Sequence, residues 1–269
     1  MKIRVNDIQI YFEWQGKGEV VVLVMGLGQD SRLWHWQREA YSKEFRCLIF
    51  DNRGAGQTDK PKGPYSIRQL ANDVAGLMNE LGLERAHIVG ASMGGAVAQE
   101  LAINYPHKIK SLSLHATFPK ADNYMKQTLE NFLTFRQKLT PEEFGPALGS
   151  WMFTPLFFNE REDELIAFRK WMLANPYPMP EEPFAWQVAA CKEHDTVDRL
   201  NRITAPTLVT VGDKDILTPL HFAQLLAEKI PRAKLVVLPG AAHCLNIERA
   251  DLFNQITLDF LRSQKSKYE

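Results

Sequence analysis

The most informative stretch of the sequence is Ala86-His-Ile-Val-Gly-Ala-Ser-Met-Gly94, in which an apolar run meets a G-x-S-x-G motif. Small residues, Gly95-Ala-Val-Ala98, follow it and begin a helical pattern. A serine on a sharp turn between a strand and a helix is exposed at the sheet edge, and the helix N-terminus behind it favours developing negative charge. The stretch therefore predicts a nucleophile at Ser92, although a plain tight turn would also satisfy the motif taken alone.

Similar apolar runs recur on both sides of this stretch. Parallel strands that are covered on both faces read as nearly continuous apolar runs, and the helical patterns between these runs can supply the crossovers that such strands need. The segment 8–14 instead alternates, as an edge or antiparallel strand should. The pattern predicts an α/β fold with a doubly wound, mostly parallel sheet, whose further strands are residues 19–24, 46–50, 111–115, 207–211 and 234–238.

Helix boundaries can be predicted at three places. Ser66 and Gln69 have the spacing of a capping box before an apolar stripe that ends at Gly82. Thr218-Pro219 has the pattern of a cap and a first-turn proline, which predicts a helix to about residue 230. Apolar residues at helical spacing predict a last helix over residues 248–262.

Residues 118–203 break the alternation of strands and helices. They contain no clear strand, prolines cut them into short helical pieces, and half of the chain's 28 aromatic residues fall here. We interpret this segment as a helical cap over an apolar pocket, inserted into a core formed by residues 1–117 and 204–269. Most of these rings should pack the cap against the core; Trp151, Phe153 and Trp186 are the candidates for substrate binding.

A carboxylate and a histidine follow the last two predicted strands. Val211-Gly-Asp-Lys-Asp215 comes directly after one strand, and Pro239-Gly-Ala-Ala-His243 comes directly after the other. A serine hydroxyl becomes a strong nucleophile when a histidine takes its proton, and a carboxylate orients and stabilises that histidine. Asp213 and Asp215 are both available; we favour Asp215 because it lies further into the loop.

A glycine-containing loop, Met25-Gly-Leu-Gly28, ends an early strand. Glycine lets the backbone approach a ligand closely. The backbone amides of Leu27 and Met93 can therefore donate together to the negatively charged oxygen of a tetrahedral intermediate, which makes them candidates for an oxyanion hole. A plain glycine turn is the alternative.

Over nearly all of its length the chain resembles the α/β-hydrolase superfamily. The resemblance rests on residues 25–28, the loop Asp51-Asn-Arg-Gly-Ala-Gly-Gln-Thr58, and the motifs at 90–94, 212–215 and 240–243. It implies Ser92 as nucleophile, Asp215 as acid, His243 as base, and a helical cap inserted after the sixth strand. Many members carry His-Gly where this chain has Met25-Gly26, a change that leaves the backbone amide of the oxyanion loop in place. Dehalogenase-like relatives carry aspartate at the nucleophile position, so Ser92 argues against dehalogenation.

Composition narrows the class of protein. Thirty-two basic residues balance thirty-two acidic ones, which gives no electrostatic attraction to nucleic acid or to an anionic membrane. Three scattered cysteines indicate neither a disulfide framework nor a metal cluster. No signal core and no run of eighteen apolar residues stands in the sequence, so a cytoplasmic protein is expected. The sequence does not indicate an oligomeric state.

These residues together predict a serine hydrolase of the carboxylesterase type. The substrate would be a small, hydrophobic carboxylic ester, and the chemistry needs no cofactor or metal ion. A lactonase, a C–C bond hydrolase or an acyl- or peracid-transferring enzyme could use the same three residues. A ligand-sensing protein on a hydrolase scaffold is the alternative from a different class.

Overall fold

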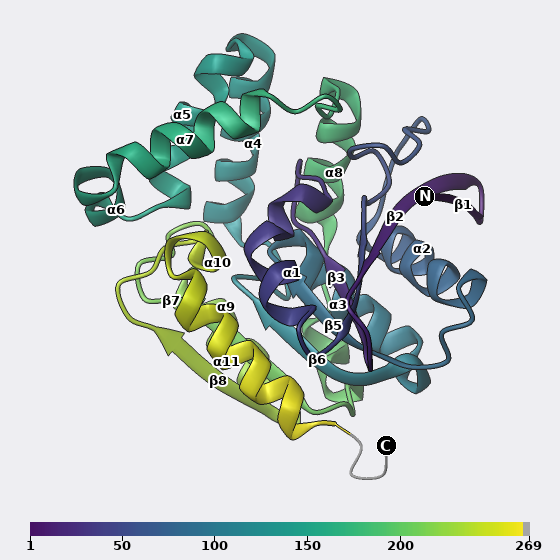
Figure 1. Cartoon of the computed structure of the whole chain (residues 1–269). Helices are drawn as coiled ribbons and strands as arrows, with labels where there is room; N and C mark the ends of the chain where they lie inside the picture. The colour runs from purple at the N-terminus through teal and green to yellow at the C-terminus, as the bar shows by residue number, and fades with distance from the viewer. Residues whose placement is uncertain (266–269) are drawn as a thin grey trace.

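The computed structural model describes residues 1–265, which form a single sheet covered by helices on both faces (Figure 1). The sheet has eight strands in the order β1-β2-β4-β3-β5-β6-β7-β8. The first two strands are antiparallel to their neighbours, and the remaining pairs are parallel. This confirms the predicted doubly wound α/β fold. Within residues 1–265, no helix has both the length and the apolar character needed to cross a membrane.

The strands lie where the apolar runs predict them, with two differences. A short strand that the sequence analysis missed, β1, pairs with β2 and forms one edge of the sheet. The run at 234–238 was expected to be covered on both faces, and this is wrong: β8 is the other edge, and Val237 is 38% exposed. The strands are β1 (Lys2–Val5), β2 (Ile8–Gln15), β3 (Val20–Val24), β4 (Arg46–Phe50), β5 (Ala86–Ala91), β6 (Ile109–His115), β7 (Thr207–Gly212) and β8 (Ala233–Leu238).

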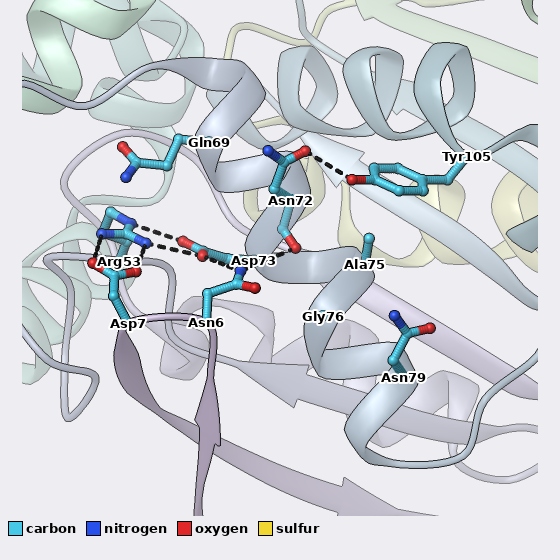
Figure 2. Close-up of a pocket in the computed structure, with 10 residues that line it drawn as sticks. All are labelled: Asn6, Asp7, Arg53, Gln69, Asn72, Asp73, Ala75, Gly76, Asn79 and Tyr105. Atoms are coloured by element: carbon cyan, nitrogen blue, oxygen red, sulfur yellow. Dashed lines mark hydrogen bonds and ion pairs between the residues drawn. The ribbon is translucent and has the colours of Figure 1, made fainter.

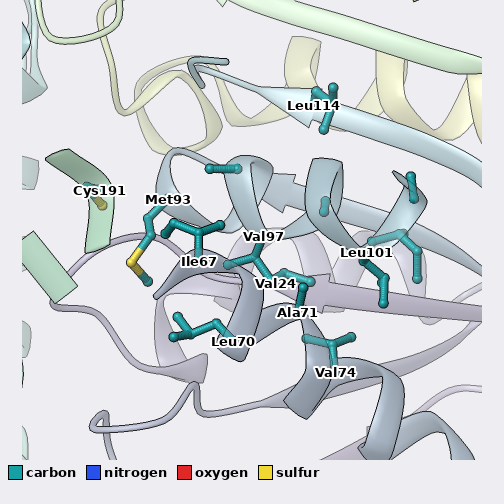
Figure 3. Packing of buried hydrophobic residues seen from close by; sticks show 14 of the residues in the cluster. Val24, Ile67, Leu70, Ala71, Val74, Met93, Val97, Leu101, Leu114 and Cys191 are labelled. Atoms are coloured by element: carbon teal, nitrogen blue, oxygen red, sulfur yellow. The ribbon is translucent and has the colours of Figure 1, made fainter. Parts of the chain in front are cut away.

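Two layers of helices bury the sheet. Helices α1 (His35–Tyr41) and α11 (Ala250–Ser263) pack together on one face. Helices α2 (Ile67–Glu80), α3 (Met93–Asn104) and α9 (Leu220–Lys229) cover the other face, and Figure 3 shows apolar side chains of α2 and α3 packed against the strands. The Ser66 side chain accepts a hydrogen bond from the Gln69 amide, as predicted for the start of α2. The helix predicted after the Thr218-Pro219 cap begins at Leu220, and the last helix predicted over residues 248–262 is α11, which begins at Ala250 after the short helix α10 (Leu245–Glu248).

The segment between β6 and β7 is helical and carries no strand of the sheet. It contains α4 (Asn123–Lys138), α5 (Pro141–Met152), α6 (Pro155–Glu160), α7 (Glu162–Leu173) and α8 (Glu181–Glu193). These helices lie beyond the C-terminal ends of the parallel strands (Figure 1). Apolar residues of α4 and α8 belong to the same core as the sheet, which fixes the insertion onto the body of the protein. We propose that this helical insertion, the predicted cap, extends from residue 118 to residue 203.

Candidate active site

Ser92 lies on a strained turn between β5 and α3. Its backbone dihedral angles are φ 55° and ψ −122°, which non-glycine residues rarely adopt. The turn leaves no room for side chains beside it: a Cβ atom on Gly90 would lie 2.4 Å from the Gly94 carbonyl oxygen, and one on Gly94 would lie 2.0 Å from the Val24 carbonyl oxygen. The two glycines of the motif are therefore required by close backbone contacts. The turn presents the Ser92 hydroxyl beyond the sheet edge.

His243 lies between Ser92 and a carboxylate. Its Nε2 atom is 3.0 Å from the Ser92 hydroxyl oxygen, and its Nδ1 atom is 3.0 Å from Oδ2 of Asp215. The three residues come from the ends of β5, β7 and β8, as the sequence order Ser, Asp, His predicts. This arrangement can remove a proton from the hydroxyl and stabilise the resulting imidazolium.

The Asp215 carboxylate is held by its own loop. Oδ1 accepts hydrogen bonds from the Leu217 and Thr218 amides at 2.9 and 2.8 Å, and Oδ2 accepts one from the Thr218 hydroxyl at 2.7 Å. Asp213 lies elsewhere, accepting a hydrogen bond from the Gly240 amide at 2.7 Å. Of the two candidate acids, the structure therefore brings Asp215 against His243. Sequence reasoning assigned Thr218 to a helix cap and missed its contact with Asp215.

The loop after β3 lies directly against the nucleophile. A Cβ atom on Gly26 would be 3.1 Å from the Ser92 Cβ atom, so glycine permits this approach. Among residues 1–265, neither the Leu27 amide nor the Met93 amide has a hydrogen-bond partner. Both residues line the same cavity as Ser92. Free amides at this position can stabilise an oxyanion.

A cavity of about 560 Å³ separates the Ser92 turn from the helical insertion. Its wall is mostly apolar, and Arg136, Glu142 and Arg169 contribute its charged side chains. Phe153 lines it, as the sequence suggested. The other two candidates do not: Trp151 packs on Phe132 and Phe135, whereas Trp186 packs on Tyr65 and against Gly63. Further aromatic lining comes from Phe118, Phe132, Phe144, Phe168, Phe184 and Phe253.

His115, Cys191 and Cys244 are further titratable side chains in the wall of this cavity. Burial lowers the pKa of His115 to about 3, so its ring is neutral near pH 7, and its Nδ1 atom lies 2.6 Å from the Thr210 hydroxyl. Burial also raises the pKa of the Cys244 thiol above its ordinary value. A protonated thiol is a poor nucleophile, so Cys244 does not compete with Ser92 for that role.

A second hollow, of about 350 Å³, lies on the α2 side of the molecule (Figure 2). Arg53 projects into it and pairs with Asp73 at 2.8 Å and with Asp7 at 2.7 Å. Hydrogen bonds from the Arg53 guanidinium hold the pKa of the Asp7 carboxyl below its ordinary value. These pairs tie the loop after β4 to α2 and to the β1–β2 turn, so Arg53 has a structural role here.

Known proteins resemble the chain over nearly its whole length. The family model of the α/β hydrolase fold matches residues 19–250. A protein of Azorhizobium caulinodans named "Putative carbamate hydrolase RutD" is 28% identical over 255 residues, which cover 95% of this chain and 96% of that protein.

Two solved structures show how closely the fold agrees. The enol-lactonase from Burkholderia xenovorans LB400 superposes with a TM-score of 0.88 at 30% identity, covering 97% of this chain and 100% of that chain. A thermophilic esterase from Thermogutta terrifontis gives a TM-score of 0.87 at 28% identity, with 99% of both chains covered. The chain therefore belongs to the α/β-hydrolase family, and its general activity is that of a hydrolase.

Proposed function

We propose that the protein is a serine hydrolase that cleaves a small, hydrophobic carboxylic ester through an acyl-enzyme intermediate on Ser92. The observation that carries this proposal is the hydrogen-bonded row of Ser92, His243 and Asp215 at the wall of a largely apolar cavity. Each side chain has the partner that its part in acyl transfer requires.

In the first half of the reaction, His243 takes the hydroxyl proton while Ser92 attacks the ester carbonyl carbon. The Leu27 and Met93 amides donate hydrogen bonds to the oxyanion of the tetrahedral intermediate. Asp215 stabilises the positive imidazolium through Nδ1. The intermediate then collapses: the bond to the leaving oxygen breaks, and His243 returns its proton to that oxygen, which releases an alcohol.

In the second half, a water molecule replaces the alcohol. His243 takes a proton from this water as its oxygen attacks the acyl carbon, and the same two amides hold the new oxyanion. Breakdown of this intermediate returns the proton to the Ser92 oxygen and releases a carboxylic acid. No metal ion or cofactor takes part in these steps.

The cavity supports the proposed substrate class. A largely apolar wall favours a substrate whose acyl or alcohol part is hydrophobic, and a volume of about 560 Å³ suits a small molecule. The names of similar proteins favour two close alternatives, a carbamate and a lactone. The triad would attack the carbonyl carbon of either in the same way, so hydrolysis rates on matched esters, lactones and carbamates distinguish the three.

The test uses p-nitrophenyl esters of increasing chain length together with a fluorophosphonate probe. Ser92→Ala should lower kcat by at least about a thousandfold and abolish labelling while the fold is retained. Ser263→Ala, at an exposed position on α11, is the matched control and should retain wild-type activity. Hydrolysis that survives in Ser92→Ala, or a wild-type protein that the probe does not label, would overturn the proposal.

A further inference from the structure

A fully buried glutamine joins the helical insertion to two loops of the core. Gln187 lies on α8, and its Oε1 atom accepts a hydrogen bond from the Gly28 amide at 3.0 Å. Its Nε2 atom donates a hydrogen bond to the Arg53 carbonyl at 2.9 Å. Both ends of the amide are therefore engaged, and they set the orientation of the side chain.

Two side-chain hydrogen bonds hold the backbone on either side of the peptide group that carries the Leu27 N–H. On one side of that group, the Asn52 side chain donates a hydrogen bond to the Met25 carbonyl at 2.8 Å. On the other side, Gln187 holds the Gly28 amide. The peptide groups before and after the Gly26–Leu27 group are thus each anchored by a buried amide side chain. With its two neighbours held, the Leu27 N–H has little freedom to change direction.

The same helix also packs an apolar ring against the loop at Gly28. Gly28 has a φ of 73°, in the region that favours glycine. The Phe184 ring, one turn before Gln187 on α8, would lie 2.8 Å from a Cβ atom at Gly28. α8 therefore contacts this loop through an apolar ring and through a hydrogen bond.

We propose that Gln187 is a positioning residue for the oxyanion hole, so that the insertion takes part in catalysis besides covering the substrate. This inference rests on the function proposed above, because it needs the Leu27 amide as an oxyanion donor. An oxyanion hole lowers the barrier when its donors are already in place, and a donor that points away contributes little. Loss of the anchor should therefore affect the transition state more than the bound substrate.

The main test is Gln187→Met, which keeps the length of the side chain and removes both hydrogen bonds. We expect kcat to fall about ten- to a hundredfold, with KM changed by less than about threefold. Affinity for an alkyl boronic acid, whose adduct on a serine mimics the tetrahedral intermediate, should fall in parallel with kcat. The Gly28 amide should also exchange its hydrogen faster, a readout that does not depend on activity.

Gln99→Met is the matched control. Gln99 is also fully buried, and its amide donates to the Phe118 carbonyl at 3.1 Å and accepts from the Thr196 hydroxyl at 2.7 Å, away from the loop after β3. This variant should lose stability as Gln187→Met does, while its kcat, its boronic acid affinity and its Gly28 exchange stay at wild-type values.

Gln187→Glu separates the hydrogen bonds from general packing, and it remains informative if Gln187→Met does not fold. A protonated carboxyl can accept from Gly28 and donate to the Arg53 carbonyl, whereas a carboxylate cannot donate. The ratio of its kcat to the wild-type kcat should therefore be near one at low pH and fall as the pH rises.

Three results would count against the inference. Wild-type kcat and boronic acid affinity in folded Gln187→Met would overturn it and leave the proposed function intact. A pH-independent kcat ratio for Gln187→Glu would do the same. Absence of Ser92-dependent hydrolysis in the wild-type protein would overturn the proposed function and this inference with it.

Discussion

Glu248 accepts a hydrogen bond from the Ala242 amide at 3.0 Å, one residue before His243. The other carboxylate oxygen accepts from the hydroxyl and from the amide of Thr154, the residue that caps α6 in the helical insertion. The carboxylate is buried, and its hydrogen bonds come from neutral donors. It therefore joins the loop of the proposed catalytic histidine to the insertion.

Replacement of Glu248 should destabilise the protein. Glu248→Ala leaves three buried donors without an acceptor, and each such loss costs about 1–3 kcal/mol before relaxation. We expect the free energy of unfolding to fall by about 2–4 kcal/mol in chemical denaturation. Glu248→Gln keeps one acceptor oxygen and should lose less. Equal unfolding midpoints for wild type and Glu248→Ala would contradict this prediction.

Substitution of Asp213 and of Asp215, the two aspartates after β7, should change kcat by very different factors. Asp215→Asn keeps the shape of the side chain and removes the charge that stabilises the imidazolium, so kcat should fall about 10³- to 10⁴-fold. Asp213→Asn keeps an acceptor for the Gly240 amide and should leave kcat within a fewfold of wild type. Steady-state kinetics of both variants on one ester give the two kcat values. A larger fall in kcat for Asp213→Asn than for Asp215→Asn would refute Asp215 as the acid of the triad.

Sequence patterns predicted every strand of the sheet except β1, and the loops at the strand ends, because these features depend on nearby residues. Ser92, Asp215 and His243 each lie in a loop that follows an apolar run, and parallel strands bring such loops to one edge of the sheet. The Met25–Gly28 loop could be found in the same way.

The contacts between the insertion and the core could not be predicted in this way. Gln187 and Gly28 are 159 residues apart, and Thr154 and Glu248 are 94 apart; no local pattern marks either pair. Trp186 illustrates the same limit, because the docking of α8 turns it toward Tyr65 instead of the cavity. Which side of an inserted helix faces the substrate depends on tertiary packing.

Two glycines in the left-handed region should respond differently to alanine. Gly28 and Gly82 have φ angles of 73° and 68°, so both substitutions incur a backbone penalty of about 1–2 kcal/mol. A Cβ atom at Gly82 would meet nothing within 4 Å, whereas one at Gly28 would press on the Phe184 ring. Gly28→Ala should therefore lose about 1–3 kcal/mol more than Gly82→Ala in thermal or chemical unfolding. Adding Phe184→Leu should recover part of that difference, and equal losses would contradict the role of the ring.

The buried ring of His115 should make stability depend on pH. An unfolded histidine binds a proton near pH 6.5, whereas burial holds the pKa of folded His115 at about 3. Between these values the unfolded state binds more protons, so stability is lost as the pH falls from about 6.5 toward 3, by up to about 1.4 kcal/mol per pH unit. His115→Phe removes this group, and its free energy of unfolding should fall less steeply than that of wild type between pH 6.5 and 4. His35→Phe, at an exposed ring on α1, is the control and should keep the wild-type slope. A wild-type slope in His115→Phe would mean that the folded protein protonates this ring as readily as the unfolded chain does.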